Sequence, residues 1–345
     1  MKIKRKNIPI FIPHLGCPNM CVFCNQRSIS GKQKFDREAV VGEIEAALDT
    51  LDPTAEVEIA YFGGSFTGID RELMIYLLDV AESYVQRKED GRAKIGGIRM
   101  STRPDYIDGE IMAILSKYSV KTVELGLQSM DDEVLTLSNR GHTAKQAEDA
   151  CKMIKSAGYE LIGQMMIGLP GSTLQKEIAT AKKICDLGAS GARIYPTVTF
   201  YETELAAMVD RGEYNMLTLD DAVFRSKEVL KVFKEHGVEC IRIGLCASDN
   251  LSDETQVKGG ANHAALGELV EGELCYDIMR ELVRTSTNGK DLSEKTLEFS
   301  VPIGELSKSI GQNSRNKKRL FEEFKPKKIT IREKNVPSIN LALTE

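Results

Sequence analysis

The stretch IPIFIPHLGCPNMCVFC, residues 8–24, joins a short apolar run to three closely spaced cysteines. The run has the apolar, β-branched character of a strand and is bounded by prolines. Cys17, Cys21 and Cys24 follow it in a C-x3-C-x2-C pattern, which puts three thiols on one loop. Three thiolates can hold three irons of a [4Fe–4S] cluster and leave the fourth iron without a protein ligand.

Two other interpretations of these cysteines stay open at this point. A structural zinc site needs a fourth Cys or His, and His14 is the candidate three residues before Cys17. The three thiols could also be structural or incidental, although such clustering is uncommon in a reducing compartment. The zinc alternative describes a binding module without redox chemistry, and metal analysis separates it from an iron–sulfur site.

The first 200 residues repeat a strand-then-helix pattern. The candidate strands are residues 8–13, 57–63, 95–101, 122–128, 159–167 and 191–196. The segments between them carry apolar residues near i, i+3, i+4 and i+7, as amphipathic helices do. Residues suited to helix N-caps are Asp36, Asp70, Asp108 and Thr143, and those suited to C-caps are Gly158 and Gly188.

Six strands that alternate with helices predict an α/β fold with parallel strands joined by right-handed crossovers. This arrangement fits either an open or incomplete barrel or a doubly wound sheet. Of the two, we expect a partial (β/α)6 barrel of TIM type over residues 1–200. A smaller C-terminal extension, residues 201–345, is expected to cover the barrel mouth. In such sheets ligands gather at the carboxyl ends of the strands, so the informative residues should follow the strands.

Composition narrows the class of protein further. The chain has 345 residues, a net charge of −5, 42 % hydrophobic residues and 28 % charged residues. These values are ordinary for a globular protein and argue against disorder or an overall electrostatic footprint for nucleic acid. No stretch of 18 apolar residues and no signal-peptide pattern is found, so we expect a cytoplasmic protein without a membrane span. Eight cysteines in such a chain are not a disulfide framework.

The cysteine triad, with Phe23 before its third member, resembles the signature of radical S-adenosylmethionine (SAM) enzymes. The resemblance continues at the strand ends, in the segments YFGGSF (61–66), STRPD (101–105), ELGLQS (124–129), NRGHT (139–143), MIGLPG (166–171) and RIYP (193–196). Together these segments look like the Elongator catalytic-subunit branch, which is related to the oxygen-independent coproporphyrinogen oxidases. The match covers roughly residues 8–270.

The resemblance implies a cofactor and a site. Cys17, Cys21 and Cys24 would ligate a [4Fe–4S] cluster, and SAM would complete the coordination of its fourth iron. Reductive cleavage of SAM by an electron from ferredoxin or flavodoxin would give a 5′-deoxyadenosyl radical that abstracts hydrogen from the substrate. The residues expected to contact SAM are Gly63, Gly64, Ser65, Ser101, Arg103, Gln128, Arg140, Ile167 and Leu169. The residues expected to act at the substrate are Glu124, Gln128 and Tyr195.

Some of these residues also have a structural explanation. Arg103 could form an ordinary salt bridge instead of a fork on the SAM carboxylate. Glu124 and Gln128 alternate onto one face of their strand, where they could equally satisfy structural hydrogen bonds. His142 precedes a helix and could serve as a neighbour of its cap.

The substrate is where the sequence departs from the resemblance. Elongator catalytic subunits carry an acetyltransferase domain and a basic N-terminal extension, and we expect this chain to lack both. Two basic clusters, residues 314–319 and 325–334, and the polar segment 250–267 are the surface available to cover the barrel mouth. Lysines and arginines lining that mouth would favour a polyanion such as tRNA. The alternative is a small carboxylated metabolite, as in the coproporphyrinogen oxidases.

Overall fold

The computed structural model describes residues 5–12, 15–17, 21–25, 35–87, 90–245 and 255–344. His14 and the first part of the polar segment 250–267, both named above, lie outside the described residues. Contacts divide the chain into two compact units. The larger unit comprises Met1–Thr218 and Val232–Asn262, and the smaller comprises Leu219–Lys231 and His263–Glu345.

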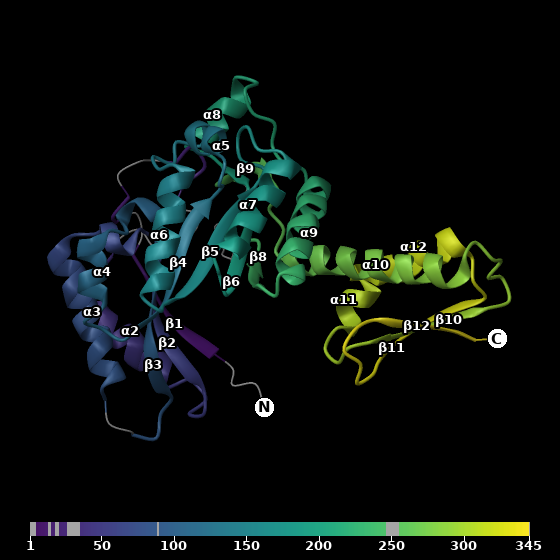
Figure 1. Cartoon of the computed structure of the whole chain (residues 1–345), viewed down its shortest axis with the longest axis horizontal. Helices are drawn as coiled ribbons and strands as arrows, with labels where there is room; N and C mark the ends of the chain where they lie inside the picture. Colours follow the sequence, from purple (N-terminus) through teal and green to yellow (C-terminus); the bar gives the residue numbers. More distant parts are fainter. Residues whose placement is uncertain are drawn as a thin grey trace. The chain divides into compact units, whose positions relative to one another are not determined.

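The larger unit is built on a seven-stranded sheet with the order β1-β2-β3-β4-β5-β6-β8 (Figure 1). Its strands are β1 (Arg5–Phe11), β2 (Glu56–Phe62), β3 (Lys94–Thr102), β4 (Val120–Gln128), β5 (Glu160–Ile167), β6 (Gly191–Pro196) and β8 (Glu239–Ile243). Every neighbouring pair is parallel. The first and last strands do not pair with each other, so the barrel is partial, as predicted. The prediction of six strands is one short, because β8 extends the sheet beyond β6.

Helices fill the crossovers between these strands (Figure 1). They are α2 (Ala39–Leu48), α3 (Arg71–Val85), α4 (Gly109–Leu115), α5 (Asp132–Leu137), α6 (Ala144–Ser156) and α7 (Leu174–Asp186). The side chains of Asp70, Asp108 and Thr143 accept hydrogen bonds from the third backbone N–H of their helices, which confirms them as N-caps. Asp36 is a wrong prediction: it accepts from the N–H of Glu38 in the preceding turn, and α2 begins at Ala39.

The two faces of the sheet differ in chemistry because they meet different neighbours. The face toward the helices is apolar: Ile59, Met165 and Ile194 are completely buried there. Tyr61 on this face donates its hydroxyl to the carbonyl of Leu77 in α3. Alternation along each strand sends the intervening side chains to the inner face of the partial barrel. That inner face carries charged and polar residues, and it is the place where a buried ligand would be held.

The rest of the larger unit lies after β6. A two-stranded antiparallel sheet joins β7 (Val198–Phe200) to β9 (Val257–Gly260). The short helix α8 (Glu204–Asp210) follows β7. Leu205 at its start donates its backbone N–H to the carbonyl of Val22, which belongs to the segment around the three cysteines, residues 15–25, called the cysteine segment below. The start of α8 therefore packs on the segment that carries Cys21 and Cys24, where Leu205 and Tyr214 join a cluster with Cys21 and Phe23.

The smaller unit combines helices with a three-stranded sheet of order β11-β10-β12. Its elements are α10 (Leu266–Thr287), β10 (Thr296–Val301), α11 (Leu306–Ile310), α12 (Arg315–Phe324), β11 (Lys328–Glu333) and β12 (Asn340–Thr344), and the boundary between the units falls within α9 (Leu219–Glu235). Met279, Val283, Leu297, Phe299 and Leu320 form the centre of its separate hydrophobic core. None of the helices in the described ranges is long and apolar enough to cross a membrane.

Candidate functional site

The cysteine segment lies at the carboxyl end of β1 and is anchored by its neighbours. Val22 donates its backbone N–H to the carbonyl of Ser138, and the N–H of Cys24 bonds to the carbonyl of Cys21 in a tight turn. Cys21 is buried, Cys24 is half-buried and Cys17 is exposed. Among the described residues, no three His, Cys, Asp or Glu side chains are close enough together to hold a metal ion.

Two buried guanidinium groups face the sulfur of Cys21. Nη1 of Arg140 lies 3.2 Å from Sγ, and Nη1 of Arg103 lies 3.9 Å from it. Arg140 is fixed by a bond from Nη2 to the carbonyl of Gly126, 2.5 Å away, and Arg103 by a bidentate bridge to Asp105 at 2.9 and 2.8 Å. The two guanidinium groups place positive charge beside a sulfur that is a predicted metal ligand. Arg103 thus forms the ordinary salt bridge that was one of its two predicted roles. Its guanidinium also faces Cys21, a predicted ligand of the cluster.

The Gly-Gly-Ser segment after β2 packs directly on the cysteine segment. Gly63 has φ +101°, and a Cβ on Gly64 would lie 2.3 Å from the carbonyl oxygen of Leu15. Ser65 donates its backbone N–H to that same carbonyl, and its hydroxyl lies 2.9 Å from the hydroxyl of Thr102. Glycine is therefore required at position 64 by backbone contact between two loops.

Replacing Gly64 by alanine is expected to displace the cysteine segment and to lower the iron content of the reconstituted protein several-fold. The methyl group cannot fit 2.3 Å from a backbone carbonyl, so one loop has to move. Gly42 in α2 is the matched control: a Cβ there meets nothing within 4 Å, and alanine is favoured in a helix by about 0.5–1 kcal/mol. Equal iron content in Gly64→Ala and Gly42→Ala contradicts the prediction.

Polar atoms without partners surround this end of the sheet. Gln128 ends β4 with φ +65°, an uncommon conformation for a residue with a side chain, and its Oε1 is buried without a hydrogen bond. Nε of Arg140 and Nε2 of His142 are likewise buried and unpaired. Burial, together with the charge of Arg140, lowers the pKa of His142 to about 4, so its imidazole is neutral at pH 7. Unpaired buried groups at the end of a strand are typical of a ligand site.

A network of charged side chains crosses the inner face of the sheet below the cysteines. Glu124 on β4 is completely buried. It accepts from Nε of Arg99 on β3 at 2.5 Å, from Nε of Arg193 on β6 at 2.8 Å and from Gln164 on β5 at 2.7 Å. Arg99 also reaches Glu58 on β2 at 3.5 Å. Five adjacent strands, β2 to β6, thus contribute to one network, with Glu124 at its centre.

The network sets the ionisation of its members. Burial acts to raise the pKa of Glu124, but Arg193, Arg99 and the bond from Gln164 outweigh it and hold that pKa below its usual range. Burial also acts against the charge of Arg193, yet Tyr195 and Glu124 raise its pKa. Glu124 is therefore an anion whose two oxygens accept hydrogen bonds from three side chains, those of Arg99, Arg193 and Gln164.

The other predicted site residues fall on two faces of the sheet. Ser101 lies on the inner face, where Gln164 approaches its hydroxyl at 3.5 Å, and Tyr195 lies beside Arg193. Leu169 packs in the cluster around Cys21 and Phe23. The strand alternation assigns Ile167 to the helix-covered face, because Gly163 on that face abuts Ile184 of α7. A contact between the Ile167 side chain and adenine stays a prediction that its face does not favour.

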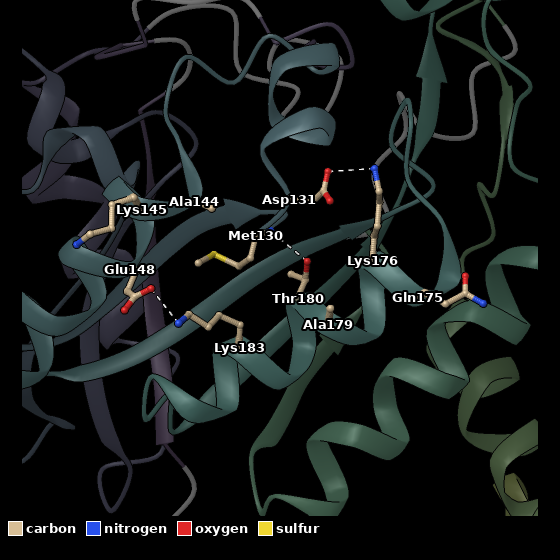
Figure 2. A pocket seen from close by; sticks show the side chains of 10 residues that line it. All are labelled: Met130, Asp131, Ala144, Lys145, Glu148, Gln175, Lys176, Ala179, Thr180 and Lys183. Atoms are coloured by element: carbon tan, nitrogen blue, oxygen red, sulfur yellow. Dashed lines mark hydrogen bonds and ion pairs between the residues drawn. The ribbon is translucent and has the colours of Figure 1, made fainter.

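A groove on the outside of the larger unit contains none of the predicted residues. It lies between α6 and α7 and is lined by residues that include Lys176 and Lys183 (Figure 2). Lys176 pairs with Asp131 at 3.1 Å, and Lys183 pairs with Glu148 at 2.8 Å. The charges of these two lysines are already balanced, and the groove is on the helix layer rather than at the strand ends.

Sequence reasoning missed several residues of the network. Glu58 and Arg99 were treated only as parts of apolar strands, and Thr102, which bonds Ser65, was not singled out. A charged residue inside an otherwise apolar strand was the available signal, because such a charge needs a partner when the strand is buried. Its partner lies on another strand, and the sequence gives no means of pairing the two.

Comparison with known proteins now identifies the family. A model described as the radical SAM superfamily matches residues 11–184, and one described as a radical SAM C-terminal domain matches residues 189–276. The chain belongs to the radical SAM superfamily and is an enzyme of that class. The superfamily implies a [4Fe–4S] cluster and SAM.

The predicted resemblance to Elongator catalytic subunits is confirmed by similar proteins. The chain is 27 % identical over 290 residues to a tRNA uridine(34) acetyltransferase of Methanocaldococcus infernus, covering 74 % of this chain and 53 % of that protein. It is 26 % identical over 239 residues to Elongator complex protein 3 of Drosophila melanogaster, covering 59 % and 43 %. The chain thus spans about half the length of these relatives. A solved structure of the M. infernus Elp3, lacking N-terminal residues 1–46, shares the fold: its TM-score is 0.59 at 21 % identity, over 81 % of this chain and 63 % of that one.

The residues present fit the implied cofactor by their donor chemistry. The cysteine segment offers three sulfur donors, and sulfur is the ligand that iron–sulfur clusters take. Arg103 and Arg140 supply positive charge beside one of these sulfurs. The unpaired Oε1 of Gln128 can accept a bond from a bound ligand at the same end of the sheet.

Proposed function

We propose that this chain is a radical SAM enzyme in which Cys17, Cys21 and Cys24 hold the [4Fe–4S] cluster and that its substrate is an RNA. The observation that carries the first part is the placement of three thiols on one segment at the strand ends, beside two buried guanidinium groups. A cluster and SAM held there would supply reductive cleavage of SAM and radical abstraction of hydrogen from the substrate. A ferredoxin or flavodoxin as electron donor is part of this proposal.

The chain's own residues bind and orient. Gly63, Gly64 and Ser65 bring a backbone edge close to the cysteine segment, where its polar groups can meet the methionine end of SAM. Gln128 and Arg140 offer unpaired buried atoms to the same ligand. Glu124 acts as a positioning residue, because its oxygens are engaged by Arg99, Arg193 and Gln164.

Support for an RNA substrate comes from the relatives and from the smaller unit. One relative is named as a tRNA-modifying enzyme. On α12, Lys317 and Lys318 are exposed, and neither forms an ion pair with any acidic side chain that the structure describes. Lys327 and Lys328 are also exposed, at the start of β11. Uncompensated lysines are available for phosphates.

Arg319 from the same basic cluster has a different role. Its guanidinium bonds both oxygens of Glu273 at 2.6 and 2.9 Å and stacks on the ring of Tyr276 at 3.6 Å. Replacing it would disturb the smaller unit itself. A test of RNA binding therefore uses Lys317 and Lys318 and leaves Arg319 in place.

Bulk tRNA is expected to bind the full chain at low salt and to bind more weakly at moderate salt. The double variant Lys317→Ala/Lys318→Ala should lower the slope of log affinity against log salt by up to about 2, since each lost phosphate contact removes about 0.9. The matched control is Lys145→Ala/Lys152→Ala, which removes two exposed lysines of α6 that pair with Asp149 and Glu148. RNA should also raise 5′-deoxyadenosine release by the reconstituted protein. If tRNA affinity changes neither with salt nor in the double variant, the RNA proposal is contradicted. The small carboxylated metabolite then remains as the candidate substrate.

A further inference from the structure

Two arginines lie side by side on the inner face of the sheet. Arg242 on β8 is in register with Arg193 on β6, and a bulge between Ala192 and Arg193 sets this pairing. Paired residues of adjacent strands project to the same face, and Arg193 projects inward to Glu124. Arg242 is therefore an inner-face residue of the strand that ends the sheet.

Among the described residues, Arg242 has no acidic partner for its charge. Arg193 is held by Glu124 at 2.8 and 3.0 Å, and Arg99 is shared between Glu124 and Glu58. Arg242 forms no ion pair with an acidic residue anywhere in the described part of the chain. The backbones of adjacent strands are about 4.8 Å apart. Like charges carried on paired positions of such strands repel each other, and an anion bound between them would offset that repulsion.

The burial of Arg242 and its position in the sheet indicate that its charge could serve a ligand. Arg242 is half-buried, so water screens its charge only in part. It lies one residue before the end of β8, and the backbone N–H of Gly244 just beyond bonds to the carbonyl of Ile194. The carboxyl ends of parallel strands are where such sheets bind ligands. Lys176 and Lys183 in the outer groove of Figure 2 are each paired with a carboxylate, whereas Arg242 has no acidic partner among the described residues.

We propose that Arg242, beside Arg193, binds an anionic group of the substrate, a phosphate or a carboxylate. This deepens the proposed function and rests on it, because it names the chemistry of the substrate rather than that of the cofactor. A guanidinium offers a planar fork that matches either anion with two parallel hydrogen bonds. Arg193 and its bonds to Glu124 fix the inner wall, and Arg242 supplies the unused donors.

The test measures anion binding to the full chain without iron or SAM, by thermal unfolding in phosphate, acetate or chloride at matched ionic strength. Either phosphate or acetate is expected to stabilise the wild type beyond chloride, and Arg242→Gln should weaken that anion's apparent affinity at least tenfold. Arg211→Gln is the matched control, since Arg211 is exposed and pairs with Glu204 and Glu213. A preference for phosphate indicates a nucleotide or RNA backbone, and a preference for acetate indicates a carboxylated metabolite.

Two results would overturn the proposal. One is equal anion stabilisation of the wild type and Arg242→Gln, or none in either protein. The other is a lower melting temperature of Arg242→Gln in chloride, because loss of an unpaired charge beside Arg193 should leave stability unchanged or raised. Arg242→Lys keeps the charge without the fork and should bind the anion with intermediate affinity. Anion binding is measured without SAM cleavage. The result for Arg242 can therefore be interpreted even if the proposed radical SAM reaction is not observed.

Discussion

Cys21→Ala is expected to abolish release of 5′-deoxyadenosine from SAM after anaerobic reconstitution and reduction with dithionite. Cys21 is the buried member of the triad and the one faced by Arg140 at 3.2 Å. Loss of an outer-shell partner of a metal typically costs about 10–100-fold, so the loss of a ligand should exceed that range. Iron and sulfide content should fall in the same variant.

The control for this prediction is another cysteine outside the segment. Cys185 lies on α7 and is half-buried, so Cys185→Ala removes a thiol without touching the strand ends. Its SAM cleavage and iron content should match the wild type. Equal turnover of Cys21→Ala and Cys185→Ala would refute the ligand assignment. Zinc in place of iron and sulfide in the wild type would instead support the zinc-stabilised binding module.

Glu124→Gln is expected to lower the free energy of unfolding by about 3–5 kcal/mol, the usual cost of removing one partner from a buried ion pair. The amide would leave Arg99 and Arg193 buried without their shared anion. Chemical denaturation measures the difference. Glu204→Gln is the matched control, because Glu204 pairs with Arg211 at the surface, where such a pair is worth about 0–1 kcal/mol.

The effect of Glu124 should depend on pH in a defined direction. The two arginines hold the pKa of Glu124 in the folded protein below its ordinary value of 4.5. A carboxylate with a lowered folded pKa stabilises the protein above its unfolded pKa and loses that contribution as the pH falls through the folded pKa. The stability gap between wild type and Glu124→Gln should therefore be full at pH 7 and shrink below about pH 4.5. A gap that stays constant to pH 3 contradicts the assignment of Glu124 as the paired anion.

Much of the fold follows from local patterns. The six predicted strands fall within a few residues of β1 to β6, because apolar runs and helical periods are short-range features of the chain. Three of the four predicted N-caps are correct for the same reason: Asp70, Asp108 and Thr143 bond to backbone groups three residues away. The cysteine triad is also local, since seven or fewer residues separate its members, and it indicated the family that comparison confirmed.

The pairing of distant side chains is what only the tertiary structure decided. The sequence marks Glu124 as a charge in an apolar strand, but its partners Arg99 and Arg193 lie on the strands β3 and β6. The register of the parallel strands decides which residues of neighbouring strands lie opposite each other. That register depends on the conformation of the crossover connections, which cannot be predicted from the sequence alone. The same holds for Gly64, whose need for glycine comes from the carbonyl of Leu15 in another loop. The sequence determines the chemical character of each side chain. Its role depends on which distant residues the tertiary structure places beside it.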